Sequence, residues 1–212
     1  MRVDVITLHA VQNYGSVLQA LATQKLLEKH GCEVKIINYI REDVRYKNIL
    51  QARSNGNIIK KIVLYPNVKK WKKVFKGFCN EYLNLTDRSY TTENDFKDYP
   101  LDADMFCTGS DQVWNSKWNQ GIISPLYLSF VPEDKFRFSL AASFGQDKLS
   151  QDEVKATKKY IEKYNCISVR ESSGKKIIEQ QYKYPYAEHI IDPTLMLDDC
   201  LLYTSPSPRD RG

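Results

Sequence analysis

The hydrophobic and polar positions of the chain alternate in blocks that predict strands and helices in turn. A mostly apolar run over residues 3–8 (VDVITL) predicts a buried strand. Residues 16–30 then carry apolar side chains at helical spacing, and Gly31 follows as the expected C-terminal cap. Residues 34–39 (VKIINY) predict a second strand. A strand, a helix and a strand in this order form a βαβ unit, which implies a parallel sheet.

The same alternation continues along the rest of the chain and predicts an α/β domain with a Rossmann-like parallel sheet. Further strands are expected at 104–108, 138–142, 166–169 and 188–191, and further helices at 150–164 and 171–181. In open parallel sheets ligands bind beyond the carboxyl ends of the strands. We therefore expect four segments that follow strands to gather at one edge of the sheet: 9–16, 109–115, 143–145 and 170–173.

Charge adds one feature to this pattern. The chain has 212 residues and a formal net charge of +5, but between Val44 and Asn80 it has ten Lys and Arg residues and no Asp or Glu. Apolar side chains recur there at helical spacing, which places the lysines on the opposite face: Val68, Trp71, Phe75, Phe78, Cys79 and Tyr82. The helix 68–82 is either a core helix with a solvated basic face or a peripheral contact with an anionic membrane. No nucleic-acid module accompanies the charge, so nucleic acid is not an expected partner.

The composition excludes several classes of protein. With 42% hydrophobic residues the chain is neither collagen-like nor wholly disordered. No run approaches the roughly 18 apolar residues of a membrane span. Arg2 and Asp4 come too early for a secretory signal. The five cysteines contain no CxxC pair, so no zinc-ligand spacing is present. These features predict a cytoplasmic protein, at the inner face of the membrane if the basic helix makes that contact.

The first candidate loop, Asn13, Tyr14, Gly15 and Ser16, leads directly into a predicted helix. A glycine there lets backbone amides come close to a ligand, and a helix N-terminus favours an anion. The alternative is that Ser16 only caps the helix. The loop is not GxGxxG and the chain has no Walker pattern, which weighs against a dinucleotide or ATP site.

The second candidate loop is the strongest signal, and it runs Gly109, Ser110, Asp111, Gln112, Val113, Trp114 and Asn115. The glycine permits a tight turn, and four side chains supply hydrogen-bond donors and acceptors. The tryptophan provides a flat apolar wall of the kind that sugar- or nucleotide-binding loops have. The alternative is a polar turn in which Trp114 is a buried plug.

Two further loops follow strands. Ser143, Phe144 and Gly145 end a strand of small residues that permits a close approach of a ligand. Arg170 follows the strand 166–169, and its guanidinium suits a carboxylate or a phosphate. The alternative for Arg170 is an ion pair with Glu171 or with a neighbouring helix.

The remaining polar residues give weaker signals. His9 lies where a strand ends and either faces the cleft or is structural. No Ser/His/Asp arrangement can be assembled by motif. The segment 192–194 (Asp-Pro-Thr) closes a strand, and we interpret it as a turn that leads out of the domain.

Five segments, taken in order, resemble the polysaccharide pyruvyl transferase family over residues 3–197. They are NYGSVLQALATQKLLEKHG, GSDQVWN, SLAASFG, SVRESSG and IIDPTLML, of which GSDQVWN is the most specific. The resemblance implies the N-terminal half of a GT-B-like enzyme with two Rossmann-like domains. It also implies transfer of a pyruvyl group from phosphoenolpyruvate to a pair of sugar hydroxyls, with a ketal formed and phosphate released. The acceptors are sugars of bacterial capsules, exopolysaccharides or secondary cell-wall polymers. It implies no cofactor, and the need for a metal stays open.

The resemblance also assigns roles to residues of this chain. Arg170 is expected to hold an anionic group of phosphoenolpyruvate, while Asn13, Tyr14, Gly15 and the loop 109–115 are expected to line the cleft. Asp111 is the candidate base or acceptor-orienting group. The Arg/His motif of the family's second domain does not occur in this sequence, so we expect the chain to be catalytically inert. Two other functions stay open: a GT-B glycosyltransferase that uses a nucleotide sugar, and a non-catalytic sugar-binding module.

The end of the chain has an unusual sequence. Residues 200–210 (CLLYTSPSPRD) back-translate, in one reading frame, into a transposon-end sequencing adapter, and Arg211 and Gly212 follow. The alternative is an ordinary Ser/Pro-rich tail. We expect residues 1–199 to be the N-terminal domain, 200–212 to be a non-native tail, and the C-terminal domain to be absent.

Overall fold

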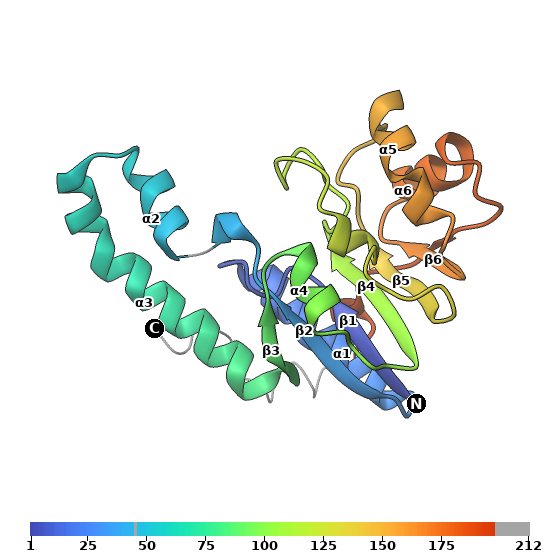
Figure 1. The fold of residues 1–212 in the computed structure, drawn as a ribbon, viewed down its shortest axis with the longest axis horizontal. Helices are drawn as coiled ribbons and strands as arrows, with labels where there is room; N and C mark the ends of the chain where they lie inside the picture. Colours follow the sequence, from blue (N-terminus) through green and yellow to red (C-terminus); the bar gives the residue numbers. More distant parts are fainter. Residues whose placement is uncertain (45, 198–212) are drawn as a thin grey trace.

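The computed structural model describes residues 1–44 and 46–197, so the expected tail at 200–212 lies outside the described residues. Within these ranges the molecule is built on a seven-stranded, all-parallel sheet with the order β3-β2-β1-β4-β5-β6-β7 (Figure 1). The strands are β1 (Arg2–Ile6), β2 (Glu33–Tyr39), β3 (Leu85–Tyr90), β4 (Met105–Asp111), β5 (Phe136–Ala142), β6 (Cys166–Val169) and β7 (Glu188–His189). This confirms the predicted α/β class with a Rossmann-like parallel sheet.

Helices connect the strands and cover both faces of the sheet. They are α1 (Tyr14–Lys29), α2 (Tyr46–Ser54), α3 (Ile58–Tyr82), α4 (Glu93–Asp98), α5 (Gln151–Ile161) and α6 (Ser172–Lys176), which continues into a π-helical turn over Ile177–Gln181. Short 3-10 turns lie at η1 (Glu42–Val44), η2 (Ser124–Tyr127) and η4 (Pro193–Leu195). In the described part of the chain, none of these helices is both long enough and apolar enough to cross a membrane.

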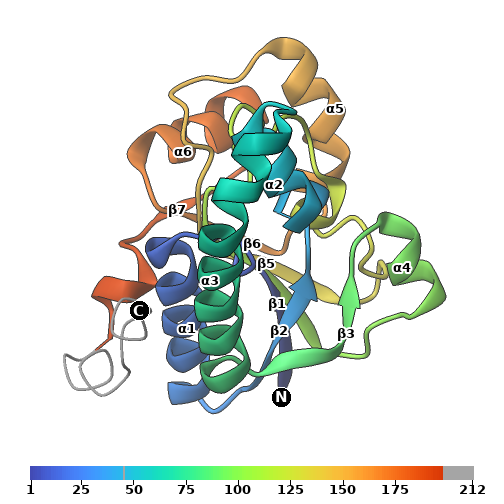
Figure 2. The same ribbon diagram turned by 90° about the vertical axis from the view of Figure 1, so that its left-hand side faces the viewer.

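Two apolar clusters hold these layers together. On one face α1 and α3 lie side by side (Figure 2), and Val17, Leu21 and Phe78 pack there against Val3 and Val5 of β1. The other cluster joins the strands to α4, α5 and the turns after α6, and its largest buried side chains include Trp114, Phe144 and Tyr182. Burial of apolar surface on both faces is what a parallel sheet requires.

The winding direction of the sheet reverses between β1 and β4. Val3 of β1 pairs with Val34 of β2 on one side and with Met105 of β4 on the other. The chain thus runs outward from β1 to β3 and then returns to β4. In open α/β sheets this switch point is where the loops after two adjacent strands separate and leave room for a ligand.

Two parts of the structure differ from the sequence prediction. The edge strand β3 (LTDRSY) was not predicted because four of its six residues are polar and three of them are exposed. Helix α3 begins at Ile58, ten residues before the predicted apolar stripe, and it continues through Pro66. Within the stripe Val68, Phe75 and Cys79 are buried as predicted, whereas Trp71 is 38% exposed. The α2–α3 hairpin projects away from the sheet (Figure 1).

Candidate functional site

The floor of the candidate site is a buried hydrogen-bond network that joins β1, α1 and β4 at the switch point. The Gln19 side-chain amide donates to Thr7 Oγ1 at 2.9 Å, and Ser110 Oγ donates to Gln19 Oε1 at 2.9 Å. Thr7 Oγ1 in turn donates to the Ser110 carbonyl at 2.9 Å. Each of these polar groups has a partner, as buried polar groups require, so the network fixes α1 on the two strands.

Above this floor lies a cavity of about 250 Å³. Its walls come from the start of α1, the end of β4, the end of β6 and the turn η4. The lining residues are Asn13, Gly15, Ser16, Gln19, Asp111, Gln112, Trp118, Arg170, Asp192 and Thr194. The structure thus brings together three of the four predicted loops, and it adds a fifth segment at 192–194.

Asn13 caps the first turn of α1. Its side-chain oxygen accepts a hydrogen bond from the Ser16 backbone amide at 3.2 Å, so the alternative that Ser16 caps this helix is wrong. Because the cap is Asn13, the Ser16 hydroxyl is free to donate to Asp111 Oδ2 at 2.7 Å. The first turn of α1 therefore presents a helix N-terminus and an oriented carboxylate to the same cavity.

Asp111 has an unusual backbone conformation for its residue type. Its φ of +81° lies in the left-handed region that glycine prefers, and its Oδ1 accepts from the Gln112 amide at 2.8 Å. Such conformations cost of order 1–3 kcal/mol and cluster at functional sites. Nearby Gly109 has a φ of +108°, and a Cβ there would lie 2.4 Å from the Leu140 carbonyl oxygen, so this position requires glycine.

Arg170 reaches the cavity from the end of β6. Its Nη1 donates to Asp192 Oδ2 at 2.9 Å, and its Nε lies 4.0 Å from Glu171 Oε2. The expected ion-pair alternative is therefore present, but the closer partner is Asp192. The Arg170 side chain keeps 28% of its surface exposed, so its guanidinium remains accessible to a ligand.

The Asp192 carboxylate is held by more than the arginine. Its Oδ1 accepts from the Thr194 amide at 2.9 Å and from the Thr194 hydroxyl at 2.7 Å. Burial alone raises the pKa of Asp192, but the hydrogen bonds from Thr194 and Arg170 outweigh it and hold the pKa below its usual value. Asp192 is therefore ionised at neutral pH and orients the guanidinium.

The loop that follows β5 packs against the loop that follows β4 and is hydrogen-bonded to the segment that follows β6. Asn115 donates to Gln112 Oε1 at 2.7 Å, and a Cβ on Gly145 would lie 2.4 Å from the Asn115 amide nitrogen. Ser143 Oγ donates to Glu171 Oε1 at 2.6 Å. These residues do not line the cavity, with the exception of Gln112; they position the residues that do.

Trp114 is fully buried and does not offer an apolar wall to a ligand. Its indole Nε1 donates to the Leu126 carbonyl at 3.3 Å, and its ring packs against Phe144 with centroids 5.0 Å apart. The interpretation as a buried plug is therefore correct for Trp114, and Phe144 is buried with it. Tyr14 does not line the cavity either, since its ring packs on Phe75 of α3 with ring centroids 5.3 Å apart.

The tryptophan that does line the cavity is Trp118, which is 44% exposed. The Arg41 guanidinium lies 4.8 Å from the centre of its ring. Sequence reasoning missed Trp118 and Gln19, and it interpreted Asp192 as part of an exit turn. The second tryptophan of WNSKWN was the available signal for Trp118. The position of Asp192 in the site, by contrast, depends on the packing of η4 against α1, which the sequence does not indicate.

The arrangement combines one cation and a helix N-terminus with two carboxylates. Arg170 and the first turn of α1 suit a carboxylate or phosphate group, while Asp111 and Asp192 can accept hydrogen bonds from hydroxyl groups. Across the described ranges, no three His, Cys, Asp or Glu side chains gather closely enough to hold a metal ion.

Comparison with known proteins supports one family. No curated protein and no solved structure matches the chain. The family model described as polysaccharide pyruvyl transferase matches residues 13–209, which is most of the chain and includes every residue that lines the cavity. The protein therefore belongs to the polysaccharide pyruvyl transferase family.

Proposed function

We propose that the cavity at the switch point binds phosphoenolpyruvate, as the donor for pyruvyl transfer to two hydroxyls of a sugar acceptor in cell-surface polysaccharide biosynthesis. The observation that carries this proposal is that Arg170 and the first turn of α1 line the same cavity. Together they provide a bidentate cation and backbone N–H groups for a ligand with two anionic groups. From the family resemblance we further propose that this domain is the N-terminal half of a GT-B-like enzyme.

The transfer makes two new C–O bonds at one carbon. The methylene of phosphoenolpyruvate takes up a proton and becomes a methyl group, which leaves positive charge on the adjacent carbon. One sugar hydroxyl oxygen bonds to that carbon, and the second then displaces the phosphate, which leaves with its electron pair. Of the two protons lost by the hydroxyls, one balances the proton gained by the methylene and the other leaves with phosphate.

Asp111 is the proposed base or acceptor-orienting residue in this scheme. Its carboxylate lines the cavity, and the 2.7 Å hydrogen bond from Ser16 fixes one of its oxygens. The strained backbone and the hydrogen bond to the Gln112 amide fix the other. A preoriented carboxylate can accept the proton of an attacking hydroxyl or hold that hydroxyl in place.

The proton for the methylene needs a separate donor. Among the described residues that line the cavity there is no His, Lys or Cys, and Asp192 is ionised because its pKa is lowered. We therefore expect this chain to bind phosphoenolpyruvate without releasing phosphate in the presence of sugar acceptors. Phosphate released above the no-enzyme rate would contradict the inert state, and the absence of phosphoenolpyruvate binding would contradict the donor site itself.

Competition separates this proposal from the two other functions. We expect a nucleoside diphosphate to displace phosphoenolpyruvate only poorly. Tight binding of a nucleoside diphosphate with no binding of phosphoenolpyruvate would instead identify a glycosyltransferase that uses a nucleotide sugar. Saturable binding of neutral sugars alone would identify a sugar-binding module, in which the exposed Trp118 stacks on the sugar.

Helix α3 supports a peripheral contact with an anionic membrane, although at a different place from the predicted segment 68–82. Ile58, Ile59, Ile62 and Val63 are 69–73% exposed at the projecting end of α3, and Lys60 and Lys61 lie among them. Apolar side chains beside lysines favour an anionic bilayer surface. Co-sedimentation with phosphatidylglycerol vesicles but not phosphatidylcholine vesicles is expected, and Ile62→Asn should reduce it. Binding to neither kind of vesicle, or equal binding to both kinds, would contradict the proposal.

A further inference from the structure

Trp118 borders an open hollow on the surface as well as the donor cavity. This hollow, which we call the Trp118 hollow, has a volume of about 650 Å³ and lies between the loops that follow β4 and β5. Among the described residues, Trp118 is the one that lines both the hollow and the donor cavity, so the two are adjacent. Most of the other lining residues are polar: Asn115, Lys117, Gln146, Asp147 and Lys148.

Trp118 is held in a fixed orientation although it is exposed. The Arg41 guanidinium lies over its ring, 4.8 Å from the ring centre, and its backbone amide donates to Asn115 Oδ1 at 3.1 Å. Even so, 44% of the residue remains accessible. An aromatic side chain that is already ordered loses little conformational freedom when a ligand binds. The exposed indole is therefore suited to be a platform on which a ligand stacks.

Arg41, which holds this ring, is itself fixed and almost wholly buried. It is 4% exposed, and its Nε and Nη2 donate to the two carboxylate oxygens of Asp43 at 3.0 and 2.7 Å. Its Nη1 donates to Asn119 Oδ1, and the Asn119 amide donates to the Val113 carbonyl at 3.0 Å. A buried guanidinium needs such partners. These hydrogen bonds join the end of β2 to the loop after β4 and so support the platform from below.

The side chains around the ring suit an uncharged ligand with several hydroxyl groups. Gln146 and Asp147 provide amide and carboxylate groups, while Lys117 and Lys148 provide donors. Because both signs of charge are present, the hollow does not select a strongly charged ligand. A pyranose has an apolar C–H face that packs on an aromatic ring and hydroxyls at its edge that reach polar groups. The lining therefore favours a neutral sugar.

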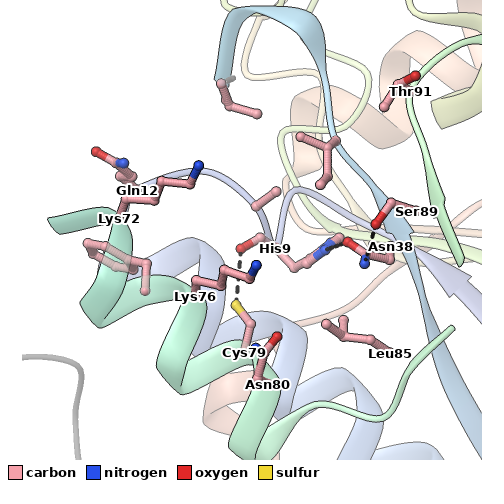
Figure 3. Close-up of a pocket in the computed structure, with 14 residues that line it drawn as sticks. His9, Gln12, Asn38, Lys72, Lys76, Cys79, Asn80, Leu85, Ser89 and Thr91 are labelled. Atoms are coloured by element: carbon pink, nitrogen blue, oxygen red, sulfur yellow. Dashed lines mark hydrogen bonds between the residues drawn. The ribbon is translucent and has the colours of Figure 1, made fainter. Parts of the chain in front are cut away.

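The cavity under α3 lacks this combination. It has a volume of about 340 Å³ and lies at the carboxyl ends of β1, β2 and β3, with Lys72 and Lys76 at its rim (Figure 3). Its lining is mostly apolar and includes Ile40, Phe75 and Leu85, and its described lining shares no residue with that of the donor cavity. Hydroxyl groups buried against apolar surface without partners cost free energy. The Trp118 hollow is therefore better suited to a sugar and lies closer to the donor.

We propose that the Trp118 hollow binds the acceptor sugar, with one face of a pyranose ring on Trp118 and its hydroxyls toward Gln146 and Asp147. The proposal rests on the pyruvyl transfer proposed above, because it makes this hollow the acceptor side of the same reaction. Trp118 also borders the cavity that contains Asp111, so a hydroxyl at the edge of the stacked sugar is directed toward that carboxylate.

The test is saturation-transfer difference NMR of the chain with four methyl glycosides: those of glucose, galactose, mannose and N-acetylglucosamine. Uridine is measured in parallel, because a nucleobase also stacks on tryptophan. At least one glycoside is expected to bind saturably, with the strongest saturation transfer at the protons of one ring face. If no glycoside binds, or if uridine binds more tightly than every glycoside, the proposal is wrong.

Variants locate the binding. Trp118→Ala should weaken glycoside binding at least tenfold, and Asp147→Ala should weaken it severalfold. Trp71→Ala is the matched control, because Trp71 is 38% exposed but lines neither the Trp118 hollow nor the donor cavity. It should leave glycoside binding unchanged. Equal effects of Trp118→Ala and Trp71→Ala would contradict the proposed platform.

Phosphoenolpyruvate separates failure of this proposal from failure of the donor site. With both ligands present, we expect inter-ligand nuclear Overhauser effects between the methylene protons of phosphoenolpyruvate and the glycoside, because the two sites share Trp118. Displacement of one ligand by the other, or joint binding without such effects, would overturn the acceptor role while the donor site stands. Glycoside binding at Trp118 without any binding of phosphoenolpyruvate would overturn the donor site and leave the sugar site standing.

Discussion

The two cavities differ in how their residues are distributed along the chain. The donor cavity at the switch point takes Asp111 and Gln112 from GSDQVWN, and its charged groups are one arginine and two aspartates. The cavity under α3 takes residues from α3, from the segment 9–12 and from β2 and β3, and its described lining has lysines but no Asp or Glu. A contiguous motif therefore marked the first cavity in the sequence, whereas the second became visible only after folding.

The two cavities also differ in the rigidity of their walls. At the donor cavity, glycines with positive φ, the strained Asp111 and the buried Trp114 fix the backbone. At the cavity under α3, one wall is a helix whose other half projects into solvent. We therefore expect substitutions near the donor cavity to reduce stability, and substitutions in the cavity under α3 to cost less.

The largest effect on stability is expected at Trp114. Trp114→Ala should lower the free energy of unfolding by about 3–5 kcal/mol, because it removes a fully buried aromatic side chain and leaves a cavity. Trp118→Ala is the control, since Trp118 is 44% exposed, and it should cost less than about 1 kcal/mol. Urea denaturation measures both. Equal losses for the two variants would show that Trp114 is not the structural tryptophan.

The next largest effect is expected at Gly109. Gly109→Ala should cost about 2–4 kcal/mol, because the new Cβ meets the Leu140 carbonyl oxygen at 2.4 Å while φ stays at +108°. Gly31→Ala is the matched control: its φ is +79°, but no atom lies within 4 Å of the added Cβ. Gly31→Ala should therefore cost only about 1–2 kcal/mol. Similar losses of stability at both glycines would mean that the close approach of β4 and β5 adds nothing to the cost of Gly109→Ala.

A smaller effect on stability is expected at Asp192 in the donor cavity. It should depend on pH, unlike the effect of a lysine substitution in the other cavity. The pKa of Asp192 is lowered in the folded protein, so its carboxylate stabilises the fold above the unfolded pKa. This contribution is lost as the pH falls from about 4 through the lower folded value. Asp192→Asn should cost about 1–2 kcal/mol at pH 7.

The measurement is the difference in unfolding free energy between wild type and Asp192→Asn, taken at pH 7 and at pH 3. The difference should shrink at pH 3. For Lys76→Gln, in the cavity whose described lining has no Asp or Glu, the difference should stay constant over this range because no lining carboxylate is protonated there. If the difference for Asp192→Asn were larger at pH 3 than at pH 7, it would contradict the lowered pKa of Asp192 in the folded protein.

The smallest effect is expected at Ser16. Ser16→Ala removes the hydrogen bond to Asp111 but leaves the cap from Asn13, so the free energy of unfolding should fall by about 0.5–1.5 kcal/mol. Asn13→Ala removes the cap and should cost about 1 kcal/mol through loss of helix stability. If Ser16→Ala shortens α1 in hydrogen-exchange measurements and Asn13→Ala does not, the assignment of the cap is wrong.

Most of the fold could be predicted from the sequence because buried parallel strands have apolar runs. The strand predicted at 166–169 is β6, and the βαβ unit at 3–39 is β1, α1 and β2. The edge strand β3 could not be predicted, since it has three consecutive exposed polar residues, a pattern that resembles a loop. Pro66 concealed the first half of α3, because a proline inside a helical pattern usually ends it.

The candidate site was predictable only where its residues follow predicted strands. Asp111 and Arg170 follow strands that the sequence predicts, so their meeting follows from the topology of a parallel sheet. The orientation of each side chain did not follow: Trp114 is buried, while Trp118, four residues later, is exposed. Asp192 depends on a contact between η4 and α1, and no local pattern encodes a contact between segments so far apart.

The most direct test of the donor site is calorimetric titration of phosphoenolpyruvate into wild type, Arg170→Lys and Lys73→Gln. We predict saturable binding by the wild type and by Lys73→Gln. Arg170→Lys should bind at least tenfold more weakly, because lysine keeps the charge but loses the planar, bidentate geometry. No binding by the wild type, or equal binding by wild type and Arg170→Lys, would contradict the assignment of this cavity to the pyruvyl donor.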